Sequence, residues 1–298
     1  MRHPPATFVF AVAVAGIAVF SCMDAVMKGL VLAIGAYTTL LWRNFAGVAI
    51  SGAIYAIKRP ALPSRAGLKL HAIRGSVSTG MAIAFFWGLA RVPMAQAVAL
   101  TFIAPLLSLF LSSILLGERI RRSTIVASTI AFVGVLVILM GQWQAELGPD
   151  AFRGALAVLA SALCYAFNIV LMRQQALVAG PIEVAFSQSL IMSVLLALGA
   201  PFLAAVPDLR HAPMILLAAA LATASLLLLA WAYARGKASS LSPSEYSAFV
   251  WASLFGWLMF REHVSLPTLA GAALIITGCL IAAGQRPDPM IEIEAAVQ

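Results

Sequence analysis

Residues 85–140 read FFWGLARVPMAQAVALTFIAPLLSLFLSSILLGERIRRSTIVASTIAFVGVLVILM and decide the fold, because a later stretch repeats their pattern. Residues 229–284 read LAWAYARGKASSLSPSEYSAFVWASLFGWLMFREHVSLPTLAGAALIITGCLIAAG. At a constant offset of 144 positions, Trp87 aligns with Trp231, Arg91 with Arg235, and Glu118 with Glu262. Matches of Ala or Leu mean little in apolar sequence, so these rarer pairs carry the repeat. We therefore predict two related halves, 1–141 and 142–284, and a disordered tail, 285–298.

The composition places both halves in a membrane. Of the 298 residues, 62% are hydrophobic and 10% charged, and the mean hydropathy is +0.99. Soluble domains are about 45–50% apolar and about 25% charged, so a soluble enzyme, a disordered chain and a nucleic-acid binder are excluded. In a membrane protein the net charge of +8 indicates topology instead, because Lys and Arg gather in cytoplasmic loops. The three cysteines lie in apolar runs without CxxC spacing, which predicts buried thiols and no metal site.

Ten runs of the chain are long and apolar enough to cross a bilayer, which takes about 20 residues. The predicted spans are 7–27, 36–57, 71–90, 94–116, 123–141, 153–172, 183–205, 211–233, 240–260 and 265–284. They are continuous rather than alternating, which predicts an all-α polytopic membrane protein and not a β-barrel. The run from Phe8 to Val26 is too long for a signal-peptide core, so we interpret it as the first span. The distribution of basic residues predicts that both termini are cytoplasmic.

The number of spans in each half has a direct consequence for function. Five is odd, so the second half is predicted to enter the membrane in the opposite orientation to the first. Inverted repeats of this kind place a binding site near the bilayer midplane and open it alternately to the two sides. The sequence has no GxSxG, HExxH or Walker-type loop, which predicts no catalytic residue, no cofactor and no hydrolysis of ATP. We therefore predict a gradient-driven or facilitated transporter.

The whole pattern resembles the drug/metabolite transporter superfamily, specifically its EamA branch. The residues that carry the resemblance are the ten repeated spans, the run 105–116 followed by Gly117-Glu118-Arg119, the segment Asp24 to Lys28, and Arg43-Asn44. The resemblance implies a secondary transporter of small metabolites in the inner membrane. It makes amino acids, including aromatic ones, the leading substrates and export the expected direction.

Several alternatives stay open under this resemblance. Uptake of S-adenosylmethionine, riboflavin or a similar metabolite is one, and drug export is another, although the first half of span 1 lacks the acidic residue of the four-span multidrug pumps. A channel-like pore and a lipid-handling membrane enzyme are alternatives of other classes. The expected partners are a small-molecule substrate and the bilayer, without nucleic acid. Small residues in the fifth and tenth spans (Ser123, Ala127, Ala131, Gly271 and Gly278) allow close packing within a monomer or in a homodimer.

The few charges inside spans are the first candidates for a site, because a charge facing lipid costs about 2.5–3.5 kcal/mol or more. Asp24 and Lys28 stand one helix turn apart and can pair. Arg43 is expected at the same depth as Asp24 and can pair with it. These three residues form either an outer gate and an anchor for a substrate carboxylate, or a structural ion pair with Lys28 reaching the interface.

A second group of charges is expected near the cytoplasmic face. Glu245 and Tyr246 begin the ninth span, where Glu245 either binds a substrate amine or a proton, or pairs with Arg74 at the start of the third. Thr101 occupies the repeat position of Glu245, so this difference between the halves is a candidate source of specificity. Glu118 and Glu262 end spans beside cations and are expected to cap helices and form interfacial ion pairs.

Neutral polar and aromatic residues complete the candidate cavity, because metabolite sites are mostly apolar with a few polar anchors. These residues are Trp87, Gln96, Thr101, Tyr165, Asn168, Gln188 and Trp231. The alternative for the aromatic rings is packing, or anchoring at the membrane interface. Pro105 is predicted to kink the fourth span and to free a carbonyl group.

Overall fold

The computed structural model describes residues 5–58, 64–116, 122–144, 150–176, 178–233, 235, 241 and 244–283. All regular elements in these residues are helical. They are α1 (Ala6–Ile34), α2 (Ala36–Lys58), α3 (Arg65–Leu89), α4 (Met94–Thr101), α5 (Ala104–Leu116), α6 (Arg122–Gln144), α7 (Asp150–Ala176), α8 (Pro181–Leu203), the 3-10 turn η1 (Leu209–His211), α9 (Ala212–Tyr233), α11 (Ser247–Phe260) and α12 (Leu266–Ala283). The predicted tail, 285–298, lies outside the described residues.

The chain is a multi-pass helical membrane protein. Six helical segments of its described part are long and apolar enough to cross a bilayer, and α6, α11 and α12 contain shorter apolar segments. The six are Thr7–Ile34, Ala36–Lys58, Met94–Leu111, Asp150–Met172, Ile182–Leu203 and Leu209–Tyr233. The 25-residue α3 is more polar and is not among them. Helices thus cover the predicted spans, whereas the count of ten crossings stays a prediction.

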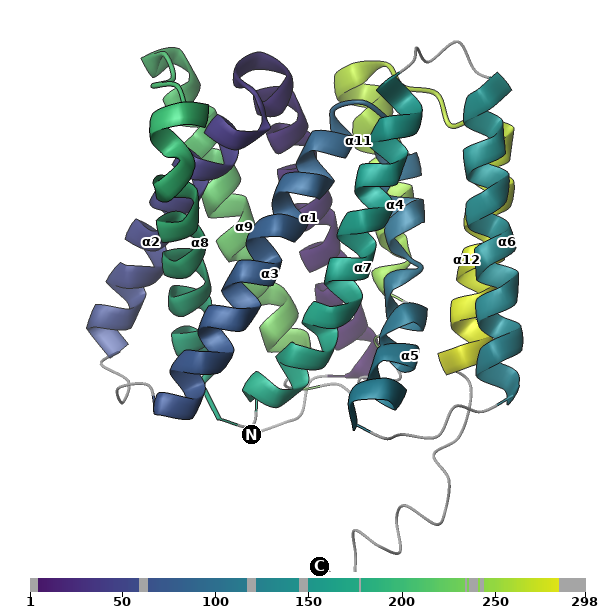
Figure 1. The fold of residues 1–298 in the computed structure, drawn as a ribbon, viewed down its shortest axis with the longest axis horizontal. Coiled ribbons are helices and arrows are strands. Elements are labelled where there is room, and N and C mark those ends of the chain that lie inside the picture. The colour runs from purple at the N-terminus through teal and green to yellow at the C-terminus, as the bar shows by residue number, and fades with distance from the viewer. Residues whose placement is uncertain are drawn as a thin grey trace, which may run out of the picture.

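The helices stand side by side in one bundle (Figure 1). In the part of the chain that the structure describes, α1 packs mainly on α9, α3 on α7, α2 on α8, and α6 on α12. Figure 1 shows α6 and α12 together at one edge of the bundle. It also shows that α1 begins and α12 ends at the same end of the molecule, drawn at the bottom, where α3 begins and α7 ends. We call this the termini end and the other the far end.

The kink predicted from Pro105 is confirmed. The helix is interrupted at Phe102 and Ile103, between α4 and α5, because proline at position 105 offers no N–H to the preceding turn. The carbonyl oxygen of Phe102, freed by the interruption, accepts a hydrogen bond from the Sγ of Cys279 on α12 at 3.2 Å. All three cysteines are free thiols, and Cys279 is buried.

The interface between α6 and α12 depends on two glycines that meet face to face. A Cβ added at Gly271 would lie 2.5 Å from the carbonyl oxygen of Gly134, and one added at Gly134 would lie 2.6 Å from that of Gly271. Gly278 likewise sits against Ala127 and Ala131. These small residues therefore serve packing within one chain, which is one of the two predicted alternatives. The side chain of Ser123 lies outside the described residues.

Replacing Gly271 by leucine is expected to destabilise the bundle by about 1–3 kcal/mol, the usual cost of overpacking. The side chain collides with backbone that cannot move without separating α6 from α12. The measurement is the thermal unfolding midpoint in detergent, followed by tryptophan fluorescence. Ala273→Leu is the matched control, because Ala273 lies on the exposed face of the same helix. Equal midpoints for the two variants would show that the helices do not meet at the glycines.

Candidate functional site

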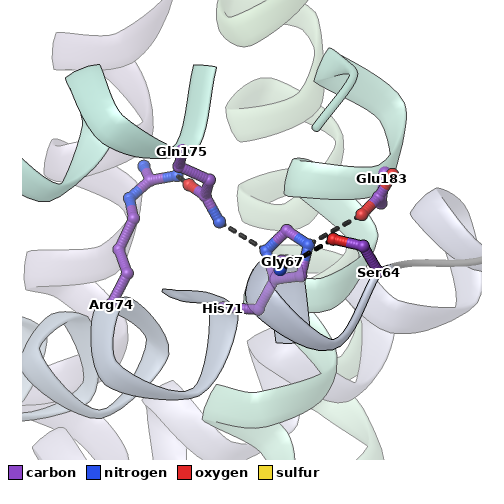
Figure 2. Close-up of polar contacts among 6 residues, drawn as sticks. All are labelled: Ser64, Gly67, His71, Arg74, Gln175 and Glu183. Atoms are coloured by element: carbon purple, nitrogen blue, oxygen red, sulfur yellow. Dashed lines mark hydrogen bonds and ion pairs between the residues drawn. The ribbon is translucent and has the colours of Figure 1, made fainter. Parts of the chain in front are cut away.

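A continuous line of polar side chains, all buried except the half-buried Gln188, joins α3, α7 and α8 towards the termini end, and Figure 2 shows its part from Glu183 to Arg74. We call it the polar line, and its members are Glu183, His71, Gln175, Arg74, Asn168, Ser78 and Gln188. At its start, the Nε2 of His71 lies 2.9 Å from the Oε1 of Glu183. The amide of Gln175 contacts His71 through its nitrogen and Arg74 through its oxygen.

The second half of the polar line runs from Arg74 deeper into the bundle. The Nε of Arg74 donates to the Oδ1 of Asn168 at 2.8 Å. The Nδ2 of Asn168 donates to the Oγ of Ser78 at 2.8 Å, and the Nε2 of Gln188 donates to the same Oγ at 3.0 Å. The sequence predicted Arg74, Asn168 and Gln188 as site residues, and the structure brings the three together.

Arg74 is the one cation of the polar line, and its contacts do not balance its charge. Its side chain is 9% exposed, and its two partners are the neutral amides of Gln175 and Asn168. Among the described residues, no carboxylate lies within the 4.0 Å of an ion pair with it. A buried charge is costly unless it is paired, and in a membrane such a residue marks a functional site. The guanidinium is therefore a candidate binder of an anionic group.

A carboxylate and two tyrosines form a second group of polar residues. The hydroxyl of Tyr233 on α9 donates to the Oε1 of Glu245 at 2.6 Å. Tyr165 on α7 is 40% exposed and lies within electrostatic reach of both Arg74 and Glu245. The predicted alternative of an Arg74–Glu245 ion pair is wrong for this structure, because each has other partners. Arg74 and Glu245 thus form no direct ion pair, although both act on Tyr165 electrostatically.

Thr101 and Tyr246 do not join the polar line. The Oγ1 of Thr101 donates to the carbonyl of Val98 in its own helix. Tyr246 packs edge-on against Phe102, with ring centroids 5.4 Å apart. Both residues therefore lie at the interruption between α4 and α5. Their predicted role in specificity stays a prediction.

Lys28 forms a second charged cluster, at the far end. Its Nζ lies 2.5 Å from the Oε1 of Glu262 and 2.6 Å from the carbonyl oxygen of Val92. The Oε2 of Glu262 accepts from the backbone N–H of Met94 at 2.8 Å, which caps the start of α4. The prediction that Lys28 pairs with Asp24 is wrong, because Glu262 takes its place. The expected capping and pairing by Glu262 are confirmed, whereas Glu118 lies outside the described residues.

Asp24 and Gln96 are buried polar residues with unused capacity for hydrogen bonds. Asp24 is 4% exposed and Gln96 is 2% exposed. The Oδ1 of Asp24 and the Nε2 of Gln96 have no hydrogen-bond partner among the described residues. Arg43 acts on Asp24 electrostatically but not within ion-pair distance. The predicted pairing of Asp24 with Arg43 is therefore a long-range attraction.

Trp87 and Trp231 each stack on an arginine of the next helix turn. The guanidinium of Arg91 lies 3.5 Å from the ring centroid of Trp87, and that of Arg235 lies 4.4 Å from that of Trp231. Each arginine also donates to the backbone carbonyl of its tryptophan. The contacts support the packing alternative for both rings rather than a place in a cavity. The same arrangement in both halves matches the sequence repeat.

Five members of the site were missed from the sequence. They are His71, Ser78, Gln175, Glu183 and Tyr233. A signal was available for the first, because His71 precedes Arg74 by three positions and so shares its helix face. Glu183 follows the helix-starting Pro181 by two positions and looks like an ordinary first-turn acid. Gln175 and Tyr233 lie at helix ends, where polar residues are common and therefore uninformative.

Two apolar hollows lie away from these polar residues. One, of about 270 Å³, lies between α5 and α6 and is lined by Leu106, Phe110 and Phe132 among others. The other lies between α6 and α12. Their linings are almost wholly apolar, so they offer no anchors for a polar metabolite. The polar line with Tyr165, Tyr233 and Glu245 is the better candidate site.

Comparison with known protein families gives two matches along the chain. The sequence pattern of the EamA-like transporter family matches residues 7–140 and, a second time, residues 152–284. A solved crystal structure shares the fold over 93% of this chain and 96% of its own, with a TM-score of 0.61 and 21% identity.

Named relatives of the chain are transporters. An uncharacterized transporter of Helicobacter pylori is 31% identical over 77% of this chain and 79% of its own. The pseudopaline exporter CntI of Pseudomonas aeruginosa is 26% identical over 88% of this chain and 90% of its own. An S-adenosylmethionine uptake transporter of Rickettsia bellii is 24% identical over 71% of each chain.

Proposed function

Because the chain belongs to the EamA-like transporter family, we propose that this small-molecule transporter carries amino acids, including aromatic ones, out of the cell. The observation that carries the proposal is the buried guanidinium of Arg74, whose hydrogen bonds in the described residues go to two neutral amides. The guanidinium of Arg74 suits a substrate carboxylate, which a planar fork of N–H donors binds well. The carboxylate of Glu245 suits the ammonium group of the same molecule. The rings of Tyr165 and Tyr233 offer faces to a cation or an aromatic side chain.

Alternating access by two inverted five-helix repeats is part of this proposal. The family pattern matches each half once. Under the offset of the repeat, α1 corresponds to α7 and α3 to α9, so the packing of α1 on α9 is the counterpart of that of α3 on α7. The contact of α1 with α11 corresponds in the same way to that of α7 with α5. This exchange supports a pseudo-two-fold relation between halves 1–141 and 142–284, with ten crossings.

The position of the site supports export. The basic loops predict that both termini are cytoplasmic, and the site lies towards the termini end (Figure 1). The substrate would thus enter from the cytoplasm of an inner membrane. At the far end, the contacts of Lys28 and Glu262 join α1, α4 and the segment after α11. Release to the outside would require these contacts to open.

The alternative substrates differ in the charges that they bring. S-adenosylmethionine, named in one relative, also carries an amino and a carboxylate group and would fit the same two anchors. Riboflavin carries neither group and would leave Arg74 and Glu245 unpaired, at a cost that disfavours binding. Counterflow into liposomes containing the purified chain, with labelled amino acids, S-adenosylmethionine and riboflavin, tests this ranking. Flux that neither saturates nor responds to internal substrate would indicate a pore and overturn the carrier.

Glu245→Gln is expected to raise the KM for L-phenylalanine about tenfold, because a hydrogen bond between charged groups is replaced by a neutral one. Inhibition by 3-phenylpropionate, which has the carboxylate but no ammonium group, is expected to stay unchanged. Both are measured by counterflow. Asp150→Asn is the matched control, because Asp150 is an exposed acid at the first residue of α7, several turns along this helix from Tyr165. A parallel loss of affinity for both compounds would contradict an ammonium contact at Glu245.

A further inference from the structure

The hydrogen bonds of the polar line have one possible direction. The guanidinium of Arg74 has donors only, so the atom of Gln175 that faces it must be the amide oxygen. The amide nitrogen of Gln175 then faces the Nδ1 of His71. Because this nitrogen is a donor, Nδ1 must accept and cannot carry a proton. The orientation of one amide follows from the chemistry of Arg74.

The same reasoning determines the state of His71. With Nδ1 as an acceptor, the imidazole is neutral and its proton sits on Nε2. Nε2 lies 2.9 Å from the Oε1 of Glu183 and donates to it. The complete sequence of donors therefore starts at Arg74, passes through Gln175 and His71, and ends on the carboxylate of Glu183. His71 is 1% exposed and Gln175 is 2% exposed, so water does not offer substitute partners.

We propose that His71 and Glu183 are positioning residues that, through Gln175, hold the guanidinium of Arg74 in place for the substrate carboxylate. This inference rests on the proposed function for the role of Arg74. Glu183 selects the tautomer with the proton on Nε2, and the bare Nδ1 selects the orientation of the Gln175 amide. The Gln175 oxygen then restrains the arginine beside Asn168 without neutralising its charge, which a carboxylate in the same place would do.

Protonation of His71 reverses this arrangement. A proton on Nδ1 faces the amide nitrogen of Gln175, so the amide must turn and present its nitrogen to Arg74, donor against donor. The groups that contact His71 are Glu183 from α8 and Gln175 from α7, and Arg74 follows on its own helix. Glu183 attracts the imidazolium and Arg74 repels it.

The first test reads His71 without any transport assay. In the full-length chain with His3, His211 and His263 replaced by asparagine, nitrogen-15 NMR of the remaining histidine in detergent reports its tautomer. We expect a neutral ring protonated on Nε2 at pH 8. The Nε–H resonance of Arg74, assigned by its loss in Arg74→Lys, is expected to move in His71→Leu and to stay in place in His71→Asn. A ring protonated on Nδ1, or an Arg74 resonance unaffected by His71→Leu, would overturn the proposal.

The second test uses counterflow of labelled L-phenylalanine. Asparagine can place its Oδ1 where Nδ1 lies and accept from Gln175, whereas leucine cannot accept. His71→Leu is expected to raise KM about tenfold with the maximal rate within about twofold. His71→Asn is expected to keep the wild-type KM. Equal effects of the two variants would make His71 a packing residue. Absence of amino-acid counterflow in the wild type would reject the substrate but leave the NMR result to decide.

Discussion

Arg74→Gln is expected to lower amino-acid counterflow at least about 30-fold, mainly through KM. A charged hydrogen bond that is lost from a buried site costs about 2–5 kcal/mol, and about 1.4 kcal/mol is a factor of ten in affinity. Glutamine can still bond to Asn168 or Gln175, so the fold has little reason to change. The loss should therefore fall on the substrate carboxylate. Initial rates over a range of L-phenylalanine concentrations measure it.

Two further variants separate charge from shape at this position. Arg74→Lys keeps the charge but has no planar fork to reach both Asn168 and Gln175, so an intermediate loss is expected. Arg65→Gln is the matched control, because Arg65 is exposed at the start of the same helix. It should transport as the wild type does. An Arg74→Gln protein that elutes as a single species and transports normally would remove Arg74 from the binding site.

Most of the helical architecture could be predicted from the sequence, because each helix follows from an apolar run of the length of a bilayer. α2 runs from 36 to 58, against the predicted 36–57, and α9 from 212 to 233, against 211–233. Some helices continue past a charged residue at which the predicted span ends. α1, for example, continues from the predicted end at 27 to Ile34. The hydrophobic signal marks the membrane, whereas the backbone decides where a helix stops.

The partners of the charged residues could be predicted much less well. Asp24 and Lys28 share a helix face, so their spacing in the sequence favoured an ion pair between them. In the fold Lys28 finds Glu262, 234 positions away. Apolar runs with a weak moment leave the rotation of a helix about its axis undetermined, so they do not reveal which residue faces which neighbour. A pair of Arg74 with Glu245 was one of two alternatives, and Arg74 instead contacts two amides.

The site residues that could not be predicted from the sequence are those whose role depends on contacts between different helices. His71, Gln175 and Glu183 are unremarkable along the chain, and each comes from a different helix. They become informative once their order is known, because the donor-only guanidinium of Arg74 then determines every proton in the line. A neutral partner for a buried cation is the arrangement expected where the cation is kept free for a ligand.

Breaking the ion pair at the far end is expected to have the second large effect. Lys28→Met should destabilise the protein by about 3 kcal/mol, the lower end of the cost of removing one partner of a buried pair. Lys28 is 4% exposed, and Glu262 is left with the N–H of Met94 as its remaining partner. The carbonyl of Val92 also loses its donor. The unfolding midpoint in detergent, followed by tryptophan fluorescence, measures the change.

A double substitution shows whether the loss comes from the charge that Lys28 leaves behind. Glu262→Gln added to Lys28→Met removes the unpaired carboxylate, while the new amide oxygen can still accept from the backbone of Met94. The double variant should therefore be more stable than Lys28→Met alone, a coupling that independent sites do not show. Lys69→Met, an exposed lysine on α3, should leave the midpoint unchanged. If the two substitutions at positions 28 and 262 simply add, Lys28 acts through packing, and the far end of the bundle is held by its apolar contacts rather than by this ion pair.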